Sequence, residues 1–443
     1  MNSTSKPSLK SSVVNSSLWT LGGYATAQVL RLVSNVIMAK LLFPEAFGLM
    51  TLVMVFMQGI SMFSDIGITP SIIQNKRGDD PNFLNTAWTM QVIRGLVLWL
   101  ITLLGAYPYS IVYDEPLLLW MLPVAGLAAI ISGFNSTSLA TANRDLKLKK
   151  VTLTELISQI TSLTVMICWV YIYPTVWALV FGNLVNSLVK LTLSQYWIAD
   201  TKNKFHWERK AASSLIRFGR WIFLTTALTF FAAQIDRIIL GYLIGTASLG
   251  IYSIAAMFKE TAFKATQMLG SKVLFPSYSK LVRANDPQRF LKALKKSRLL
   301  MISATWVATV LLLIFGSRII ETLYDDRYKD AVWMIQLLPL GTLVGILSST
   351  YHNAYLAKGK SSYISILLFY QIVVQTTLIT IGYYIYGIQG VIIALSSIGW
   401  FLYPANLIAS IKLKLWQPVI DIPVIILATI FTVLYVQNTS ILS

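Results

Sequence analysis

The sequence predicts an all-α polytopic membrane protein with about thirteen transmembrane helices. First, 56% of its 443 residues are hydrophobic and only 12% are charged, whereas soluble domains carry about 25% charged residues. Second, apolar stretches long enough to cross a bilayer recur along the chain. Third, Lys and Arg gather in alternate connections between these stretches. One cysteine and the lack of a glycine period exclude a disulfide scaffold and a fibrous protein.

The apolar stretches give the order of the predicted spans. A helix that crosses the hydrocarbon core needs about 20 mostly apolar residues. The predicted spans are residues 16–40, 46–74, 84–112, 117–141, 151–172, 175–198, 216–244, 247–275, 299–320, 331–357, 362–386, 388–411 and 419–437. The first span lacks the short apolar core and small-residue cleavage site of a signal peptide, so we expect it to be retained.

The distribution of Lys and Arg predicts the orientation in the membrane. Connections on one side hold 23 of the 36 Lys and Arg residues, and those on the other side hold four. The basic connections are the N-terminal segment and residues 75–82, 142–150, 199–215, 277–298, 358–360 and 412–414. The connections Gly245–Thr246 and Gly387–Ile388 are short and carry no charge. Because cytoplasmic connections collect positive charge, we expect a cytoplasmic N-terminus and, with thirteen spans, an outside C-terminus.

Several function classes are disfavoured by the same pattern. The net charge of +18 is spread over connections too short for a folded nucleic-acid module, so we expect no nucleic-acid partner. No GxxxxGK[ST] motif follows a strand pattern, which argues against ATP-driven transport by this chain. Two histidines without metal-ligand spacing indicate no metal site. Short outside connections favour a transporter over an enzyme, with a membrane glycan polymerase or ligase as the alternative.

An internal repeat predicts two lobes. Residues 41–53 align with residues 243–255 at an offset of 202, so that Phe47-Gly48-Leu49 falls on Leu249-Gly250-Ile251. Both copies run in the same direction across the membrane, which makes them parallel repeats. We therefore expect two six-helix lobes around a central cavity, with rocking of the lobes for alternating access. Their predicted bounds are residues 1–205 for spans one to six, 206–412 for spans seven to twelve, and 413–443 for an additional span.

Polar and charged side chains within the spans predict the substrate site. A charged side chain at mid-bilayer costs roughly 2.5–3.5 kcal/mol on insertion scales, so it must face a cavity or a partner. Steps of three and four residues place the polar residues of spans one and eight on single helical faces. The residues that we expect to line the cavity are Gln28, Arg31, Asn35, Gln58, Asp65, Arg94, Asp236, Arg237, Glu260, Lys264 and Gln267.

The balance of these charges favours an anionic ligand. Basic residues outnumber acidic ones within the spans, and Arg offers paired donors that match a phosphate. Two structural alternatives stay open at this point. Glu260 and Lys264, four residues apart, could simply neutralise each other, and Arg94 could support the fold. Proton coupling through an Asp or a Glu is also compatible with the pattern.

Segments spread over about residues 15–410 carry a family resemblance. They are AFGLMTLVMVFMQGISMFSDIGITPSIIQ (46–74), ANRDLKLKK (142–150), VWALVFGNLVNSLV (176–189), FGRW followed by IDRIILGYLIGTASLGIYSIA (218–255), LFPSYSKL (274–281), FGSRIIETLYDDRYKDAVWMIQLLPL (315–340) and AYLAKGKS (354–361). In their order and coverage they resemble the polysaccharide transporter family of the multidrug/oligosaccharidyl-lipid/polysaccharide exporter superfamily. Within it, the likeness is greatest to the O-antigen and colanic-acid type flippases.

The resemblance implies a function. Such flippases move undecaprenyl-pyrophosphate-linked oligosaccharide repeat units across the bacterial inner membrane for synthesis of O-antigen, capsule or exopolysaccharide. It assigns Arg31 and Arg237 to the pyrophosphate. It also implies membrane lipids, a polysaccharide polymerase and a chain-length regulator as partners. No cofactor is expected, and the candidates for coupling are H⁺, Na⁺ and the membrane potential.

The same superfamily supplies two alternatives. A multidrug exporter would be expected to centre on a carboxylate in the first span, but that span carries Arg31 and no acid. A flippase for lipid-linked peptidoglycan precursors fits the segments less well. Either alternative keeps the expected fold and changes only the cargo.

Overall fold

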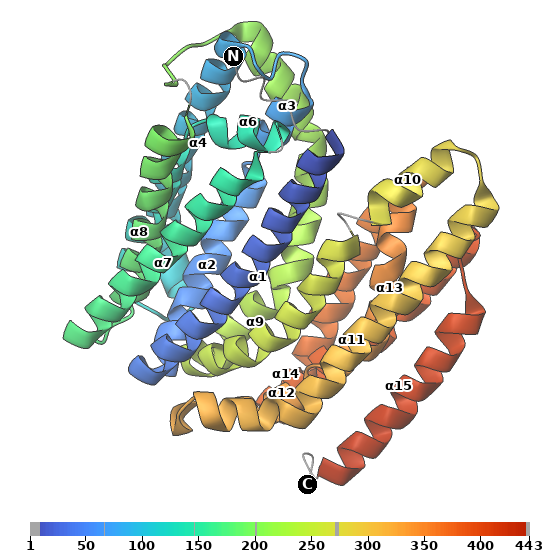
Figure 1. Ribbon diagram of the computed structural model, residues 1–443. Coiled ribbons are helices and arrows are strands. Elements are labelled where there is room, and N and C mark those ends of the chain that lie inside the picture. The colour runs from blue at the N-terminus through green and yellow to red at the C-terminus, as the bar shows by residue number, and fades with distance from the viewer. Residues whose placement is uncertain (1–8, 66, 146, 200–201, 271–273, 440–443) are drawn as a thin grey trace. The chain divides into compact units, whose positions relative to one another are not determined.

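The structure is a computed structural model that describes residues 9–65, 67–145, 147–199, 202–270 and 274–439. Within these residues every regular element is a helix, which confirms the all-α fold class (Figure 1). Eight of the described helices are long and apolar enough to cross a membrane, or up to ten if two bent pairs are each one span. The count of thirteen spans stays a prediction.

The chain forms two compact units, residues 1–227 and 228–443. The helices of the first unit are α1 (Leu9–Leu41), α2 (Pro44–Phe63), α3 (Ile68–Gln74), α4 (Pro81–Val112), α5 (Leu118–Gly133), α6 (Ser138–Arg144), α7 (Leu148–Ile172), α8 (Trp177–Leu193) and the π-helical η1 (Ser194–Ile198). Helix α9 (Arg209–Leu269) begins in the first unit and continues into the second. The lobe bounds predicted from the repeat remain a prediction.

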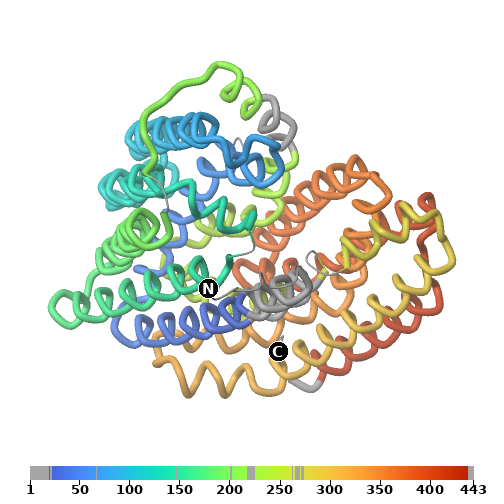
Figure 2. Tube along the Cα trace, turned by 45° about the horizontal axis from the view of Figure 1, so that its top comes forward, coloured from blue at the N-terminus to red at the C-terminus, as the bar shows by residue number. Residues whose placement is uncertain are grey.

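The second unit holds the rest of α9 and six further helices. These are α10 (Phe275–Arg283), α11 (Pro287–Leu323), α12 (Ala331–Leu337), α13 (Leu340–Ala357), α14 (Ser361–Lys412) and α15 (Pro418–Thr439), with a short 3₁₀ turn, η3 (Asp326–Tyr328). The traces of α11, α13, α14 and α15, coloured yellow to red, run alongside one another as a bundle (Figure 2). The extra C-terminal helix α15 therefore packs as part of this unit.

Two of the helices each contain a turn at a glycine. Gly245 interrupts α9 with a φ of 73°, and Gly387 interrupts α14 with a φ of 57°. A continuous helix of the 52 residues in α14 would be about 78 Å long, more than twice the roughly 30 Å hydrocarbon core. Glycine adopts this left-handed backbone without the clash that a Cβ atom would bring. The chain thus turns at the two short uncharged connections that the sequence predicts.

The repeat register agrees with the turn at Gly245. At the offset of 202, Gly245 corresponds to Phe43, which leaves the helical conformation between α1 and α2 with φ −78° and ψ 156°. The first and second units therefore interrupt their leading helices at equivalent positions. The alignment found in the sequence is thus reflected in the local backbone structure.

Three spans predicted as continuous are each two helices, which corrects the sequence analysis. Residues 46–74 divide into α2 and α3 at Gly67, whose φ is 64°. Residues 117–141 divide into α5 and α6 with a bend of 60°, and residues 331–357 divide into α12 and α13 with a bend of 43°. Pro339, which has no N–H to donate, stands at the start of α13. Hydropathy does not detect such bends, because the apolar composition continues through them.

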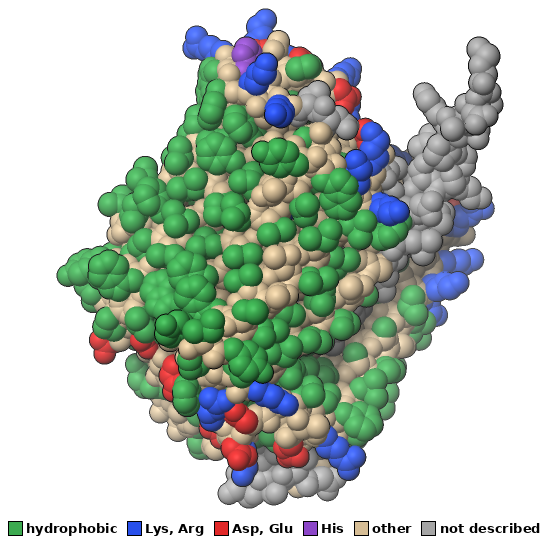
Figure 3. Space-filling view, turned by 60° about the vertical axis from the view of Figure 1, so that its left-hand side comes forward, with side chains coloured by type: hydrophobic (Ala, Val, Ile, Leu, Met, Phe, Trp, Pro, Cys, Tyr) green, Lys and Arg blue, Asp and Glu red, His purple; other side chains and the backbone are tan. Residues whose placement is uncertain are grey.

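Close helix packing depends on small residues. A Cβ atom built on Gly399 in α14 would lie 2.4 Å from the carbonyl oxygen of Gly341 in α13. One built on Gly95 in α4 would lie 2.6 Å from the carbonyl oxygen of Ala129 in α5. Within a membrane, helices gain little from burying apolar surface, so close backbone approach at small residues supplies much of their association. Figure 3 shows hydrophobic side chains covering the middle of the face drawn, with charged ones toward its ends.

A buried ion pair joins α15 to the rest of the second unit. Arg298 of α11 and Asp421 of α15 are fully buried, and the Arg298 Nη2 atom lies 2.5 Å from Asp421 Oδ1. The guanidinium also donates to Thr350 Oγ1 at 2.9 Å and to Tyr351 OH at 2.6 Å. The hydroxyls of Tyr351 and Tyr403 both donate to Asp421 Oδ2 at 2.9 Å. The sequence analysis counted Arg298 among the charges of a cytoplasmic connection, and the structure instead buries it.

This network predicts a large effect of a small substitution. Asp421→Asn leaves the Arg298 guanidinium buried without a counter-charge, so we expect it to lower the stability of the second unit by about 3–5 kcal/mol. The measurement is thermal or denaturant unfolding of the purified protein in detergent. The double variant Arg298→Met with Asp421→Leu removes both charges and should recover much of the loss. Unfolding of Asp421→Asn at the wild-type midpoint would contradict this role.

Candidate functional site

The two halves of α9 bring three charged side chains together in the second unit. Arg237 precedes the turn at Gly245, and Glu260 and Lys264 follow it. One Glu260 carboxylate oxygen pairs with Arg237 Nη2, and the other lies 2.7 Å from Lys264 Nζ. Arg237 Nη1 also donates to Gln234 Oε1 at 2.8 Å. The cluster thus has two cations on one carboxylate, and the structure adds the contact between Arg237 and Glu260, which the sequence analysis did not predict.

The exposure of these groups differs. The Arg237 side chain is 14% exposed and that of Glu260 25%, whereas the Lys264 side chain is 59% exposed. Lys264 can therefore change partner more readily than Arg237. We call Arg237, Glu260 and Lys264 the cationic cluster.

Asp236 lies next to Arg237 in sequence but has a different partner. It is 7% exposed, and its Oδ2 atom accepts a hydrogen bond of 2.5 Å from Tyr252 OH across the turn. Its Oδ1 atom has no hydrogen-bond partner among the described residues. Sequence reasoning missed Tyr252, because a contact across a turn leaves no signal in helical periodicity. Gln234 was detectable in principle, since it lies three residues before Arg237 on the same helix.

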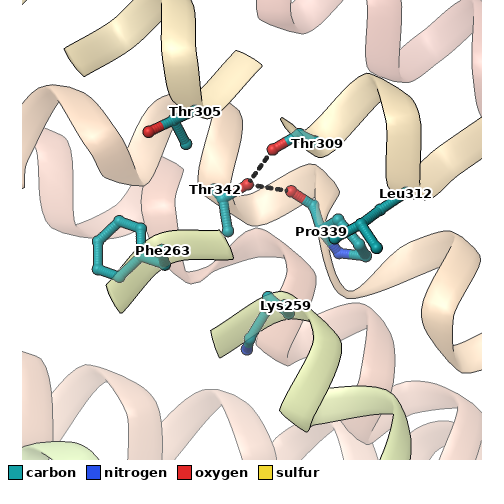
Figure 4. Close-up of a pocket in the computed structure, with 7 residues that line it drawn as sticks. All are labelled: Lys259, Phe263, Thr305, Thr309, Leu312, Pro339 and Thr342. Atoms are coloured by element: carbon teal, nitrogen blue, oxygen red, sulfur yellow. Dashed lines mark hydrogen bonds between the residues drawn. The ribbon is translucent and has the colours of Figure 1, made fainter. Parts of the chain in front are cut away.

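A small recess in the second unit lies between α9, α11 and the start of α13. Its lining includes Thr305, Thr309 and Thr342, and its empty volume is about 190 Å³. Thr309 and Thr342 share a hydrogen bond of 2.8 Å. Lys259 contributes its aliphatic stem, while its amine points away from the threonines (Figure 4). The recess has no room even for a water molecule, so it is too small for an oligosaccharide.

The first unit carries a more neutral set of residues. Arg31 is exposed on α1, while Gln28 and Asn35 are partly buried. Gln58 Nε2 lies 3.6 Å from Met62 Sδ, and Asp65 Oδ1 accepts a 2.8 Å hydrogen bond from the Gly67 amide. Helix α1 is held to α7 by Gln159 Nε2, which donates to the Ala27 carbonyl at 3.0 Å. The Asp65 carboxylate thus stabilises the break between α2 and α3.

The repeat relates the two sets of residues. At the offset of 202, Arg237 and Glu260 correspond to Asn35 and Gln58, and Lys264 corresponds to Met62. The cationic cluster therefore has an uncharged counterpart in the first unit. Arg31 has no basic equivalent, because its counterpart is Ala233. Each unit thus has an arginine at a repeat position where the other unit has an uncharged residue.

Arg94 has a structural role in the first unit. From α4, its Nη2 atom donates to the Ser61 carbonyl at 2.7 Å, and its Nε atom donates to Ser64 Oγ at 3.0 Å. A cation at the C-terminal end of α2 satisfies an orphan carbonyl and interacts favourably with the helix dipole. A cavity role for Arg94 stays a prediction, and so does the role of Gln267, whose side chain lies outside the described residues.

The connection before α9 is fastened to the first unit. The amides of Lys204, His206 and Glu208 donate to Asn85, Thr89 and Thr86 of α4, at 3.0, 3.1 and 3.1 Å. Asn203 adds hydrogen bonds to Ser136 and Thr137 at the bend between α5 and α6. Residues 202–208 are therefore fastened along α4, and we call them the strap.

An ion cluster holds the end of this strap. Arg77 lies 2.7 Å from Glu208 and 2.5 Å from Asp80. Hydrogen bonds to Glu208 and then to Asp80 raise the pKa of Arg77 above its usual value. Its guanidinium in turn lowers the pKa of both carboxyls, and the Asn82 amide helps to lower the pKa of Asp80. All three groups are therefore charged at neutral pH.

Comparison with known proteins identifies the family. A family model described as "Polysaccharide biosynthesis protein" matches residues 37–333. The chain belongs to this polysaccharide biosynthesis family. Among its relatives, the lipopolysaccharide biosynthesis protein WzxC of Escherichia coli K12 is 21% identical over 345 residues, covering 77% of this chain and 68% of WzxC. A putative O-antigen transporter of Shigella flexneri is 22% identical over 403 residues, covering 87% of this chain and 94% of the relative.

Solved structures share the fold of this family member. The lipid II flippase MurJ, in an inward closed conformation, matches with a TM-score of 0.71 at 16% identity, covering 95% of this chain and 99% of MurJ. An inward-facing multidrug resistance transporter of the MATE family matches with a TM-score of 0.73 at 12% identity, covering 88% of this chain and 94% of that chain. These likenesses show a transporter fold in a multi-pass membrane protein.

The strap predicts a pH dependence. Because the pKa of Glu208 is lowered in the folded state, its ion pair stabilises the strap above the usual carboxyl pKa of about 4.3 and is lost as the pH falls below that. We expect Glu208→Gln to lower the protection of the Lys204 and His206 amides about twofold at pH 7. The measurement is hydrogen exchange by mass spectrometry, corrected for intrinsic rates.

The control for this prediction is Lys202→Gln, which changes an exposed charge in the same strap. It should leave the protection unchanged. Near pH 3 the wild-type protein should approach the Glu208→Gln variant. A difference that is the same at pH 7 and pH 3 would show that the ion pair does not hold the strap.

Proposed function

We propose that this protein is a flippase that moves undecaprenyl-pyrophosphate-linked oligosaccharide repeat units across the bacterial inner membrane by alternating access. Its membership of a polysaccharide biosynthesis family supports the proposal, as do relatives named as a lipopolysaccharide biosynthesis protein and an O-antigen transporter. The likeness to a lipid II flippase supports a fold able to handle a lipid-linked cargo. The product pathway would be O-antigen, capsule or exopolysaccharide synthesis.

The observation that carries the proposal is the cationic cluster. Arg237 and Lys264 share one carboxylate, so the three groups of the cluster carry one excess positive charge. Arg237 and Glu260 lie in the segment Thr225–Thr261, which is long and apolar enough to cross a membrane. A guanidinium presents paired donors that fit two phosphate oxygens, while an ammonium acts as a point charge. A pyrophosphate could therefore take the place of Glu260 on these cations. We assign Arg31 on α1 as the other basic residue for the pyrophosphate.

The proposal includes the setting of the transport cycle. The N-terminus would lie in the cytoplasm, as the Lys and Arg distribution predicts, and the chain would act without a cofactor or an enzymatic step. A polysaccharide polymerase and a chain-length regulator would act after it. Coupling would use H⁺, Na⁺ or the membrane potential, and for the first two Asp236 offers a buried carboxylate with an unpartnered oxygen in the described structure.

A second candidate is a multidrug exporter, which the MATE-family fold allows. The neutral residues that the first unit has at the positions of the cationic cluster do not favour a cationic drug. The alternative from another class is a membrane glycan polymerase or ligase. Purified protein in liposomes separates these classes, since a flippase translocates a labelled lipid-linked oligosaccharide without lengthening its glycan, and glycan joining would overturn the proposal.

The assigned arginines predict a loss of transport. We expect Arg31→Ala and Arg237→Ala each to abolish export of surface polysaccharide in a strain that lacks the chromosomal gene, because the pyrophosphate loses a charged contact. Lipid-linked repeat units should then accumulate facing the cytoplasm. The readouts are surface polysaccharide and the abundance of the variant in the membrane.

The control is Arg318→Ala, which removes an exposed arginine outside the cationic cluster. It should export like the wild type. Full export by both Arg31→Ala and Arg237→Ala would refute the pyrophosphate assignment. Accumulation of units that have already been flipped would indicate a polymerase defect instead.

Removing the charge of Glu260 should strengthen substrate binding, whereas removing the arginines should weaken it. Glu260→Gln keeps the shape of the side chain but removes the anion that competes with pyrophosphate for Arg237 and Lys264. We expect undecaprenyl pyrophosphate to bind about tenfold more tightly, the equivalent of about 1.4 kcal/mol, and to be released more slowly. Lys264→Gln should weaken binding. The measurement is equilibrium binding in detergent, and weaker binding by Glu260→Gln would mean that Glu260 only supports Arg237.

A further inference from the structure

The second unit carries a concentrated basic surface on α10 and the first turns of α11. Its exposed members are Lys280, Arg283, Arg289, Lys292, Lys295 and Lys296, and we call them the α10–α11 basic face. Asp286 is the only acidic residue between Lys280 and Lys296. It caps the start of α11, where it accepts a 2.9 Å hydrogen bond from the Arg289 amide. One carboxylate therefore stands against six basic side chains.

The basic face sits on a rigid support. Tyr278 of α10 and Phe290 and Leu294 of α11 are buried in one apolar cluster with Tyr351 and Tyr355 of α13. Tyr278 OH also shares a hydrogen bond with Ser297 Oγ. The two short helical segments are thus fixed to the bundle. Their charges keep their positions relative to one another, which a polar loop would not ensure.

The position of the basic face along the bundle is set by the buried ion pair. Arg298 pairs with Asp421 in the first turn of α15. Residues 287–297 of α11 therefore extend about 16 Å beyond the level of Asp421. In Figure 1 the start of α11 reaches beyond the start of α15. Helix α11 has 37 residues, or about 55 Å, against a hydrocarbon core of about 30 Å. Its basic end consequently reaches the headgroup region.

Exposed apolar side chains border the basic ones. Leu291 is 40% exposed, Leu299 44% and Leu300 68%, and Phe275 at the start of α10 is 37% exposed. Surfaces that combine Lys and Arg with Leu and Phe suit the boundary between headgroups and acyl chains. An acidic protein partner would need no such apolar border. The border and the position at headgroup depth therefore favour lipid as the occupant.

We propose that the α10–α11 basic face binds anionic phospholipid headgroups of the cytoplasmic leaflet. The ligand is a phosphodiester lipid with net negative charge, and phosphatidylglycerol serves as the probe. The surface lies outside the cationic cluster and does not depend on the assignment of Arg31 and Arg237. Each Lys or Arg near an anionic membrane surface adds to binding, and the attraction decays within a Debye length.

The experiment reports lipid contact directly. Full-length protein with Cys168→Ser and Leu291→Cys carries a fluorophore at residue 291 and is placed in nanodiscs. Quenching by headgroup spin-labelled phosphatidylglycerol is compared with quenching by matched phosphatidylcholine. We expect the anionic lipid to quench at a mole fraction lower by a factor of about five. Raising the salt from about 0.1 M to 1 M shortens the Debye length from about 10 to about 3 Å and should remove the preference.

The variant Arg289→Gln, Lys292→Gln, Lys295→Gln and Lys296→Gln should also lose the preference. The matched control changes the same number of charges in the first unit, as Lys202→Gln, Lys204→Gln, Arg209→Gln and Lys210→Gln, and should keep it. Equal quenching by both lipids in the wild type overturns the proposal, and so does a preference that persists at 1 M salt. An equal loss in the control variant would assign the effect to net charge alone and overturns it too. Because the α10–α11 basic face shares no residue with the cationic cluster or with Arg31, failure here leaves the proposed flippase function untouched.

Discussion

A charged or polar group inside a bilayer must find its partner within the protein, since the hydrocarbon core offers none. The described structure meets this requirement by joining elements that are distant in the chain. Arg298 and Asp421 tie α11 to α15, and Arg94 ties α4 to the end of α2. These contacts hold helices whose apolar surfaces alone would associate weakly in lipid. The ion pair of Arg298 and Asp421 sets the position of α15 relative to the basic end of α11.

The same requirement separates structural charges from candidate functional ones. Arg298 has its donors occupied by Asp421, Thr350 and Tyr351 in a fully buried site, so it has little left to offer a ligand. In the cationic cluster one carboxylate serves two cations, and Lys264 is largely exposed. The cluster is thus only partly neutralised. The repeat places uncharged Asn35 and Gln58 at the equivalent positions of the first unit. The difference in charge between the two units therefore comes from side-chain identity at equivalent positions.

Interruptions of the helices have local causes that differ from one another. Gly245 and Gly387 turn the chain through left-handed backbone, and their short connections were visible in the sequence. The bend between α5 and α6 was not visible in the sequence. The strap residue Asn203 accepts hydrogen bonds from Ser136 and Thr137 at this bend. The strap thus fastens a connection that the sequence presents only as basic and polar. Its order comes from the side chains of α4, which receive three of its amides.

The sequence by itself determined the membrane class, the fold class, the repeat and the two glycine turns. These depend on composition and local hydropathy, which act within about one helix length. It also placed Glu260 and Lys264 on one helical face, because four residues make one turn. Only the tertiary structure decided that Arg237 meets Glu260, that Asp236 meets Tyr252, and that Arg298 is buried. Helical periodicity relates neighbours three or four residues apart, whereas Arg298 and Asp421 are separated by 123 residues and meet through helix packing.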